Sequence, residues 1–167
     1  MGSAQSAAYN VSDWTQHKGC PYGGRIMDRS GECMCGSVAF VARGLKPEQA
    51  SVCHCGMCQR WAGGAWIAVF VETIDCEKEE GLTWIQSSKW AERGFCNRCG
   101  SSLFWRLTAE GKYQGTTSVA LGALDDRSGV TITKEWFIDR KPNGYAFEGE
   151  RECVTEAEAF AMLNDAG

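Results

Sequence analysis

The chain has 167 residues, of which 44% are hydrophobic and 23% are charged, and its formal net charge is -4. This length gives room for one ordinary domain with a hydrophobic core, and the composition is that of a globular protein. The acidic balance disfavours general binding to nucleic acid or to an anionic membrane, so we expect neither as a partner.

Residues 1–30 are rich in Gly, Ser, Ala and Gln and show no sustained hydrophobic period. They predict an N-terminal extension that is poorly ordered or packed on the body. The first 25 residues lack a cationic start followed by an apolar core, and no stretch approaches the roughly 20 apolar residues that span a bilayer. Without an export signal, ten cysteines indicate metal binding more than disulfides, and a cytoplasmic location.

Residues 31–150 form the predicted main domain, in which short runs of β-branched and aromatic residues are separated by turn residues. The runs predict strands at 37–43, 65–72, 82–86, 101–107, 117–121 and 130–138. Many short strands with little helical periodicity between them favour a mainly β, antiparallel domain.

Residues 151–167 carry the one convincing helix. Thr155-Glu156-Ala157-Glu158 has the pattern of a capping box, and good helix formers follow as far as Leu163. The pattern predicts a short C-terminal helix that packs on the sheet and ends near Asn164.

Seven of the ten cysteines fall into three clusters with the spacing of zinc ligands, namely Cys33 and Cys35, then Cys53, Cys55 and Cys58, then Cys96 and Cys99. Residues two apart in an extended segment point to the same face, so each C-x-C pair presents both sulfurs to one side. The last cluster is followed by Gly100 and has the form of a zinc knuckle, in which glycine lets backbone N–H groups approach the sulfurs.

The number of ligands divides these clusters into two kinds of site. Structural zinc sites are closed by four protein ligands, whereas catalytic sites hold three and keep one position open. The first and third clusters together supply four cysteines, and the middle cluster supplies three. The sequence therefore predicts two zinc ions per chain, one structural and one at an open site, and hence an enzyme.

Other interpretations of the cysteines stay open. A C-x-C pair could be two buried core residues, and a C-x-x-C motif could form a redox disulfide, although the βαβ setting of that motif is absent. The middle cluster could also be closed by a fourth ligand, for which the candidates are His54, Cys20, Cys76 and Cys153. His54 is an awkward ligand because it lies between Cys53 and Cys55 and should point to the opposite face.

Three thiolates around Zn²⁺ favour one kind of chemistry. Their negative charge makes the metal a weaker Lewis acid toward water than zinc held by neutral histidines. An external thiol suits such a site better, because soft sulfur matches it and coordination lowers the pKa of the thiol. The bound sulfur can attack an aldehyde, or leave from carbon in the reverse direction. We therefore expect formation or cleavage of a carbon–sulfur bond in a small-molecule thiol or thiol adduct.

The combined pattern resembles the glutathione-dependent formaldehyde-activating enzyme and centromere protein V family over residues 31–147. The motifs are Gly31-x-Cys33-x-Cys35-Gly36, Cys53-His54-Cys55-x-x-Cys58 and Arg93-Gly94-Phe95-Cys96-x-x-Cys99-Gly100-Ser101, with Gly122-Ala123-Leu124-Asp125-Asp126 and Phe137-Ile138-Asp139-x-Lys141-Pro142 after them.

The resemblance implies a Mss4-like (β-tent) zinc domain of short antiparallel strands. It implies a structural zinc on Cys33, Cys35, Cys96 and Cys99 and a catalytic zinc on Cys53, Cys55 and Cys58. The activity it implies is that of a carbon–sulfur lyase similar to S-(hydroxymethyl)glutathione synthase, which joins glutathione and formaldehyde.

The two carboxylates of a thiol such as glutathione favour arginine or lysine partners. Arg60 follows Cys58 closely in sequence, and Arg93 precedes the third cluster, so these two are the first candidates for substrate binding. A non-catalytic zinc module that binds a protein partner is the alternative function, and a zinc or thiol redox sensor is a third. The sequence is compatible with a monomer or a homodimer.

Overall fold

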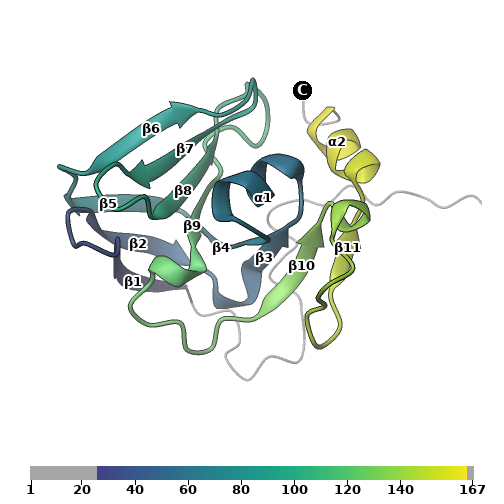
Figure 1. The fold of residues 1–167 in the computed structure, drawn as a ribbon, viewed down its shortest axis with the longest axis horizontal. Helices are drawn as coiled ribbons and strands as arrows, with labels where there is room; N and C mark the ends of the chain where they lie inside the picture. Colours follow the sequence, from purple (N-terminus) through teal and green to yellow (C-terminus); the bar gives the residue numbers. More distant parts are fainter. Residues whose placement is uncertain (1–25, 165–167) are drawn as a thin grey trace, which may run out of the picture.

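The computed structural model describes residues 26–164 and consists of two β-sheets with two short α-helices (Figure 1). Its elements in chain order are β1 (Met27–Glu32), β2 (Ala39–Leu45), η2 (Pro47–Gln49), β3 (Ala50–Cys53), α1 (Gly56–Ala62), β4 (Trp66–Val71), β5 (Thr73–Lys78), β6 (Leu82–Gln86), β7 (Ala91–Cys96), β8 (Ser102–Leu107), β9 (Thr117–Ala120), η3 (Leu121–Ala123), β10 (Ile132–Trp136), η4 (Ile138–Arg140), β11 (Glu152–Val154) and α2 (Glu156–Asn164). The prediction of a mainly β domain of short strands with a C-terminal helix is confirmed.

The strands form a small sheet and a large one. The small sheet has the order β1-β2-β5, and the large one has the order β11-β10-β3-β4-β9-β8-β7-β6. Most neighbours are antiparallel, as the sequence predicts, but β10 runs parallel to both β3 and β11. The parallel pairing brings the C-terminal part of the chain against β3, which leads directly into the middle cysteine cluster.

Several elements differ from the sequence-based expectations. Strand β1 begins at Met27, so the end of the predicted extension 1–30 belongs to the small sheet, while residues 1–25 lie outside the described part. The sequence of β1 is polar and alternates weakly, and its place in the sheet comes from antiparallel pairing with β2. Helix α1 was not predicted because it has only seven residues and glycines at both ends.

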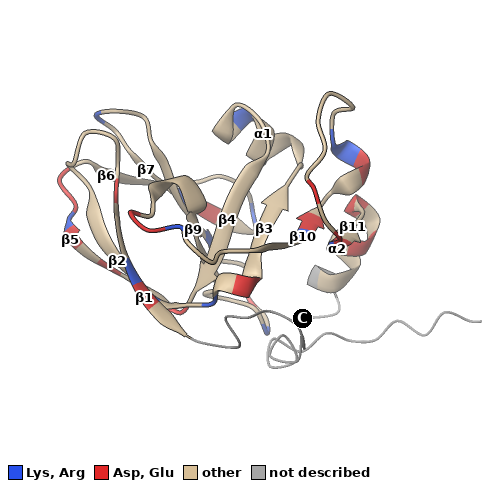
Figure 2. Cartoon of the chain, turned by 90° about the horizontal axis from the view of Figure 1, so that it is seen from below, with Lys and Arg blue, Asp and Glu red and all other residues tan. Residues whose placement is uncertain are grey.

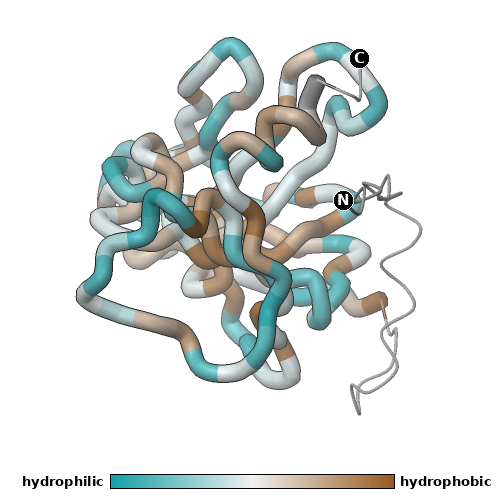
Figure 3. The backbone as a smooth tube through the Cα atoms, turned by 90° about the vertical axis from the view of Figure 1, so that its right-hand side faces the viewer, coloured by the Kyte–Doolittle hydropathy of each residue, from teal (hydrophilic) through white to brown (hydrophobic). Residues whose placement is uncertain are grey.

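The main core joins the two sheets. Phe40 of β2 packs edge-on against Phe104 of β8, with ring centroids 4.9 Å apart, and Trp84 of β6 stacks on Phe104 at 5.7 Å. Such aromatic pairs contribute about 0.5–1.5 kcal/mol each beyond the area they bury. Hydrophobic segments accordingly gather in the middle of the chain trace, and hydrophilic segments lie in the outer loops (Figure 3).

Many charged residues of both signs lie on loops, and acidic residues are prominent around β10, β11 and α2 (Figure 2). Between residues 26 and 164, no helix has the length and apolar character needed to cross a membrane.

Gly81 lies where a side chain would press on the cysteines at the junction of the sheets. A Cβ atom there would meet Ser37 Oγ and would lie 3.0 Å from Cys96 Sγ. Gly81→Ala is therefore expected to lower the free energy of unfolding by about 1–3 kcal/mol, the usual range for overpacking. Denaturant unfolding measures the change. Gly122→Ala is the control, because its Cβ would meet no atom within 4 Å; equal stability of the two variants would contradict the expectation.

Candidate metal centres

Cys33, Cys35, Cys96 and Cys99 come together as one group, which we call the four-cysteine group. Their sulfurs all lie within 4.8 Å of one another. Cys33 and Cys35 occupy the connection between β1 and β2, whereas Cys96 ends β7 and Cys99 lies in the turn before β8. The group therefore joins the small sheet to the large one.

Hydrogen-bond donors surround the four-cysteine group. The backbone N–H of Val38 donates to Cys33 Sγ at 3.3 Å, and Ser37 Oγ lies 3.1 Å from Cys35 Sγ and 3.2 Å from Cys96 Sγ. Hydrogen bonds from the hydroxyl and backbone N–H of Ser101 lower the pKa of the Cys99 thiol to about 5. Donors that favour thiolates fit a bound metal cation, which requires deprotonated sulfur.

Cys53, Cys55 and Cys58 form a second group, the three-cysteine group, whose sulfurs also lie within 4.8 Å of one another. Cys53 ends β3, Cys55 is the N-cap of α1 and Cys58 lies in its first turn. The backbone N–H of Cys58 donates to Cys55 Sγ at 3.4 Å, as expected for a capping side chain. Gly63 ends the helix with φ +72°, a conformation that glycine adopts without strain.

The thiols of the three-cysteine group cannot all ionise together because their charges repel. Hydrogen bonds from the Cys53 and Cys58 thiols lower the pKa of Cys55 to about 2. A hydrogen bond with Cys53 lowers the pKa of Cys58, but the hydrogen bond with Cys55, burial and the nearby charge outweigh it and raise that pKa to about 11. Three soft sulfur donors crowded at one place are the donor set that a soft divalent cation prefers, and its charge would offset their repulsion, so the residues fit a metal ion.

The three-cysteine group lies in an aromatic environment that contains a buried cation. Cys58 belongs to a small apolar cluster with Trp66, against which Trp61 is packed. Arg93 of β7 is only 3% exposed, and its Nη2 donates to Cys58 Sγ at 3.5 Å. Within the described residues, Arg93 Nε and the indole N–H groups of Trp61 and Trp66 are buried without a hydrogen-bond partner. Unpaired donors of this kind favour a ligand that carries an acceptor atom.

The two predicted substrate arginines occupy different places. Arg93 contacts the three-cysteine group, whereas Arg60 lies on the exposed side of α1 and donates to Gly56 O at 3.3 Å. Arg60 lines a shallow hollow of about 310 Å³ together with Gly56 and Gln59. The hollow is therefore open to solvent on the helix that supplies Cys58.

Of the four candidate fourth ligands, the three between residues 26 and 164 do not join the three sulfurs. His54 is fully buried, with Nε2 at 2.8 Å from Glu135 Oε2 and Nδ1 at 3.2 Å from the Tyr145 hydroxyl. Cys76 and Cys153 belong to neither group, and Cys20 lies outside the described residues. Over residues 26–164, no His, Cys, Asp or Glu completes the three-cysteine group as a fourth ligand.

Comparison with known proteins finds similar sequences and a solved structure that resembles this chain in part. A protein of Schizosaccharomyces pombe (strain 972) named as an uncharacterized lyase is 28% identical over 134 residues, which cover 80% of this chain and 95% of that protein. A putative glutathione-dependent formaldehyde-activating enzyme of Halomonas elongata is 30% identical over 83 residues, 44% of this chain and 53% of that protein, so the match spans about half of its length. A crystal structure of a Rhodobacter sphaeroides protein matches with a TM-score of 0.46 at 23% identity, covering 59% of this chain and 88% of that one.

The family model of the glutathione-dependent formaldehyde-activating enzyme matches residues 28–140. That range contains all seven cysteines of the two groups. The chain therefore belongs to the glutathione-dependent formaldehyde-activating enzyme family.

Proposed function

We propose that this protein is a zinc-dependent carbon–sulfur lyase that binds the sulfur of a small-molecule thiol or thiol adduct at its three-cysteine group. The observation that carries the proposal is the contrast between a group of four sulfurs and a group of three that lacks a fourth ligand over residues 26–164. Closed zinc sites serve the fold, and open ones admit a substrate. The names of the relatives, a lyase and a glutathione-dependent formaldehyde-activating enzyme, support the same reaction class.

Zinc bound at Cys53, Cys55 and Cys58 would supply a soft Lewis acid that lowers the pKa of an incoming thiol. The second zinc, on the four-cysteine group, would be structural. In the proposed reaction the thiol sulfur adds to the carbonyl carbon of formaldehyde, and the proton of the thiol ends on the carbonyl oxygen. The reverse reaction breaks the carbon–sulfur bond and returns that proton to sulfur.

The chain's own residues have three tasks in this reaction. Arg93 places a positive charge beside Cys58 and so offsets the negative charge of the thiolates. Its unpaired Nε and the indole N–H of Trp66 can donate to the oxygen of the aldehyde or of the hydroxymethyl product. The apolar cluster around Trp66 limits the access of water to the reacting sulfur. Arg60, beside the open hollow, can bind a substrate carboxylate.

Exchange NMR between formaldehyde and the S-hydroxymethyl adduct of glutathione tests the proposal. Catalysis predicts an exchange rate that rises linearly with protein concentration above the uncatalysed rate. Protein that contains two zinc ions and adds nothing to the rate, with glutathione or with other small thiols, would contradict the lyase assignment. That result would favour the alternative of a zinc module that binds a protein partner.

Arg93→Met is expected to lower kcat/KM in this assay by about 10- to 100-fold. A hydrogen bond to a charged group contributes about 1.5–3 kcal/mol, and each 1.4 kcal/mol is a factor of ten in rate. Arg106→Met, on the neighbouring strand β8, is the matched control, because Arg106 is partly exposed and pairs with Glu92. A rate for Arg93→Met within twofold of the control would show that Arg93 takes no part in the reaction.

A further inference from the structure

His54 lies between two metal-ligand candidates but faces away from them. It is 0% exposed, whereas Cys53 and Cys55 on either side are partly exposed and meet in the three-cysteine group. The backbone at Cys55 is extended, with φ -62° and ψ 154°. Because successive side chains of an extended segment point to opposite faces, fixing the His54 ring on one face fixes both flanking sulfurs on the other.

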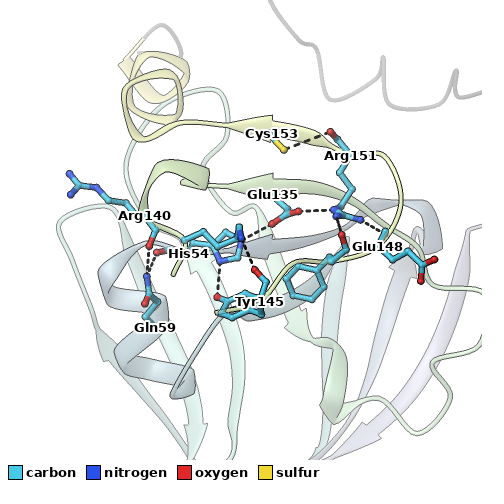
Figure 4. Close-up of polar contacts among 10 residues, drawn as sticks. His54, Gln59, Glu135, Arg140, Tyr145, Glu148, Arg151 and Cys153 are labelled. Atoms are coloured by element: carbon cyan, nitrogen blue, oxygen red, sulfur yellow. Dashed lines mark hydrogen bonds and ion pairs between the residues drawn. The ribbon is translucent and has the colours of Figure 1, made fainter. Parts of the chain in front are cut away.

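Both nitrogens of the His54 ring have partners from distant parts of the chain (Figure 4). Nε2 lies 2.8 Å from Glu135 Oε2 on β10, and Nδ1 lies 3.2 Å from the hydroxyl of Tyr145. A carboxylate can only accept, so Nε2 is the donor, and in the neutral ring Nδ1 accepts from Tyr145. This arrangement allows one orientation of the ring.

Glu135 is itself fixed by a second partner. Arg151 Nε donates to Glu135 Oε1 at 2.7 Å, and both side chains are less than 10% exposed. The guanidinium of Arg151 also donates to the backbone carbonyls of Phe147 and Glu148. Burial by itself would raise the pKa of the Glu135 carboxyl, but the hydrogen bonds from Arg151 and His54 outweigh it and leave the pKa lowered. The carboxylate is thus held in place and kept as an acceptor.

The backbone of His54 is held as firmly as its ring. Its N–H donates to the carbonyl of Trp136 at 3.0 Å, which extends the parallel pairing of β3 with β10. Its carbonyl accepts from Gln59 Nε2 at 2.5 Å, and the same amide group donates to the Arg140 carbonyl at 3.1 Å. All four polar groups of His54 are therefore engaged.

We propose that His54 is a positioning residue, fixed by Glu135 and Tyr145, that holds the Cys53 and Cys55 sulfurs in the geometry of the metal site. The inference rests on the proposed function, because it requires a metal at the three-cysteine group. Outer partners that orient metal ligands are commonly worth 10- to 100-fold in metal affinity. The segment 135–151 thereby contributes to the affinity of a site to which it supplies no ligand.

Zinc competition against a chromophoric chelator tests the proposal, because it resolves two affinities in one molecule. His54→Leu removes both hydrogen bonds of the ring and leaves the Glu135–Arg151 pair intact. We expect the affinity of the three-cysteine group to fall about 10- to 100-fold and that of the four-cysteine group to stay within twofold. His54→Gln, whose amide N–H can replace Nε2 as the donor to Glu135, is expected to recover most of the loss.

Lys134→Met is the matched control for a merely structural effect. Lys134 is the buried neighbour of Glu135 on the same strand and pairs with Glu152 at 2.9 Å. This variant should lower the melting temperature while leaving both zinc affinities unchanged. The positioning role is wrong if Lys134→Met lowers the zinc affinity of the three-cysteine group as much as His54→Leu does. It is also wrong if His54→Leu lowers the zinc affinities of both groups equally.

Three further outcomes complete the test. If His54→Leu yields no folded protein, Tyr145→Phe, which removes one hydroxyl, is measured in its place; a loss of several-fold at the three-cysteine group supports the proposal and no loss overturns it. A wild-type chain that binds only one zinc contradicts the proposed function itself. A wild-type chain that binds two, with His54→Leu unchanged, overturns this inference alone.

Discussion

Cys96→Ser is expected to leave the chain unfolded at 37 °C. Cys96 is fully buried, and its group ties the connection between β1 and β2 to the turn between β7 and β8. Structural zinc contributes on the order of 10 kcal/mol of binding free energy in small zinc domains. A domain of this size has a total free energy of unfolding of about 5–15 kcal/mol. The zinc-binding free energy lost in Cys96→Ser is therefore comparable with the total stability of the domain. Circular dichroism and zinc content report the result.

Cys76→Ser is the control for Cys96→Ser. Cys76 lies on β5 of the small sheet, packs against the same core and belongs to neither cysteine group. The Cys76→Ser protein should keep its fold and both zinc ions. A Cys96→Ser protein that melts cooperatively within a few degrees of this control would show that the four-cysteine group does not hold the sheets together.

Cys55→Ser is expected to abolish activity while the fold survives. Serine is a preferred N-cap, so its hydroxyl can replace the sulfur that accepts from the Cys58 N–H at the start of α1. The three-cysteine group loses one of its three ligands, and we expect zinc to fall from two ions per chain to one. The rate in the exchange assay should drop at least about 1,000-fold, as for removal of an essential group in other enzymes.

Zinc analysis and thermal unfolding of the same Cys55→Ser sample distinguish an effect on metal binding from an effect on the stability of the fold. The expected pattern is one zinc per chain, a melting temperature within a few degrees of wild type, and no activity. Cys153→Ser changes an exposed thiol on β11 and is the control for the loss of a cysteine as such. Full activity in Cys55→Ser would show that the reaction does not use the three-cysteine group.

The sequence predicted those features that depend on local spacing. The cysteine clusters were identified because metal ligands must lie within a few residues of one another, and the structure brings the same seven sulfurs into two groups. Strand β6 coincides with the predicted 82–86, because β-branched and aromatic residues there form a short run between Gly81 and two serines. Helix α2 begins after Thr155, where the Glu158 carboxylate accepts from the Thr155 N–H in the predicted capping box.

The network around His54 could not be predicted from the sequence. His54 and Glu135 are 81 positions apart, and they meet because β10 pairs in parallel with β3. No local pattern encodes that pairing, and Arg151 reaches Glu135 only through the further strand β11. The contact between Arg93 and Cys58 likewise depends on the position of α1, a helix too short for its period to be seen.

The measurement that tests the central claim most directly is the absorption spectrum of the Co²⁺-substituted protein during titration with glutathione. Thiolate-to-metal and d–d bands report the ligands of each metal. An open three-cysteine group predicts two bound cobalt ions, a saturable spectral change from only one of them, and loss of that change in Cys55→Ser. Two cobalt centres that both stay unchanged, with glutathione and with other small thiols, would contradict the claim that the group admits the sulfur of a substrate.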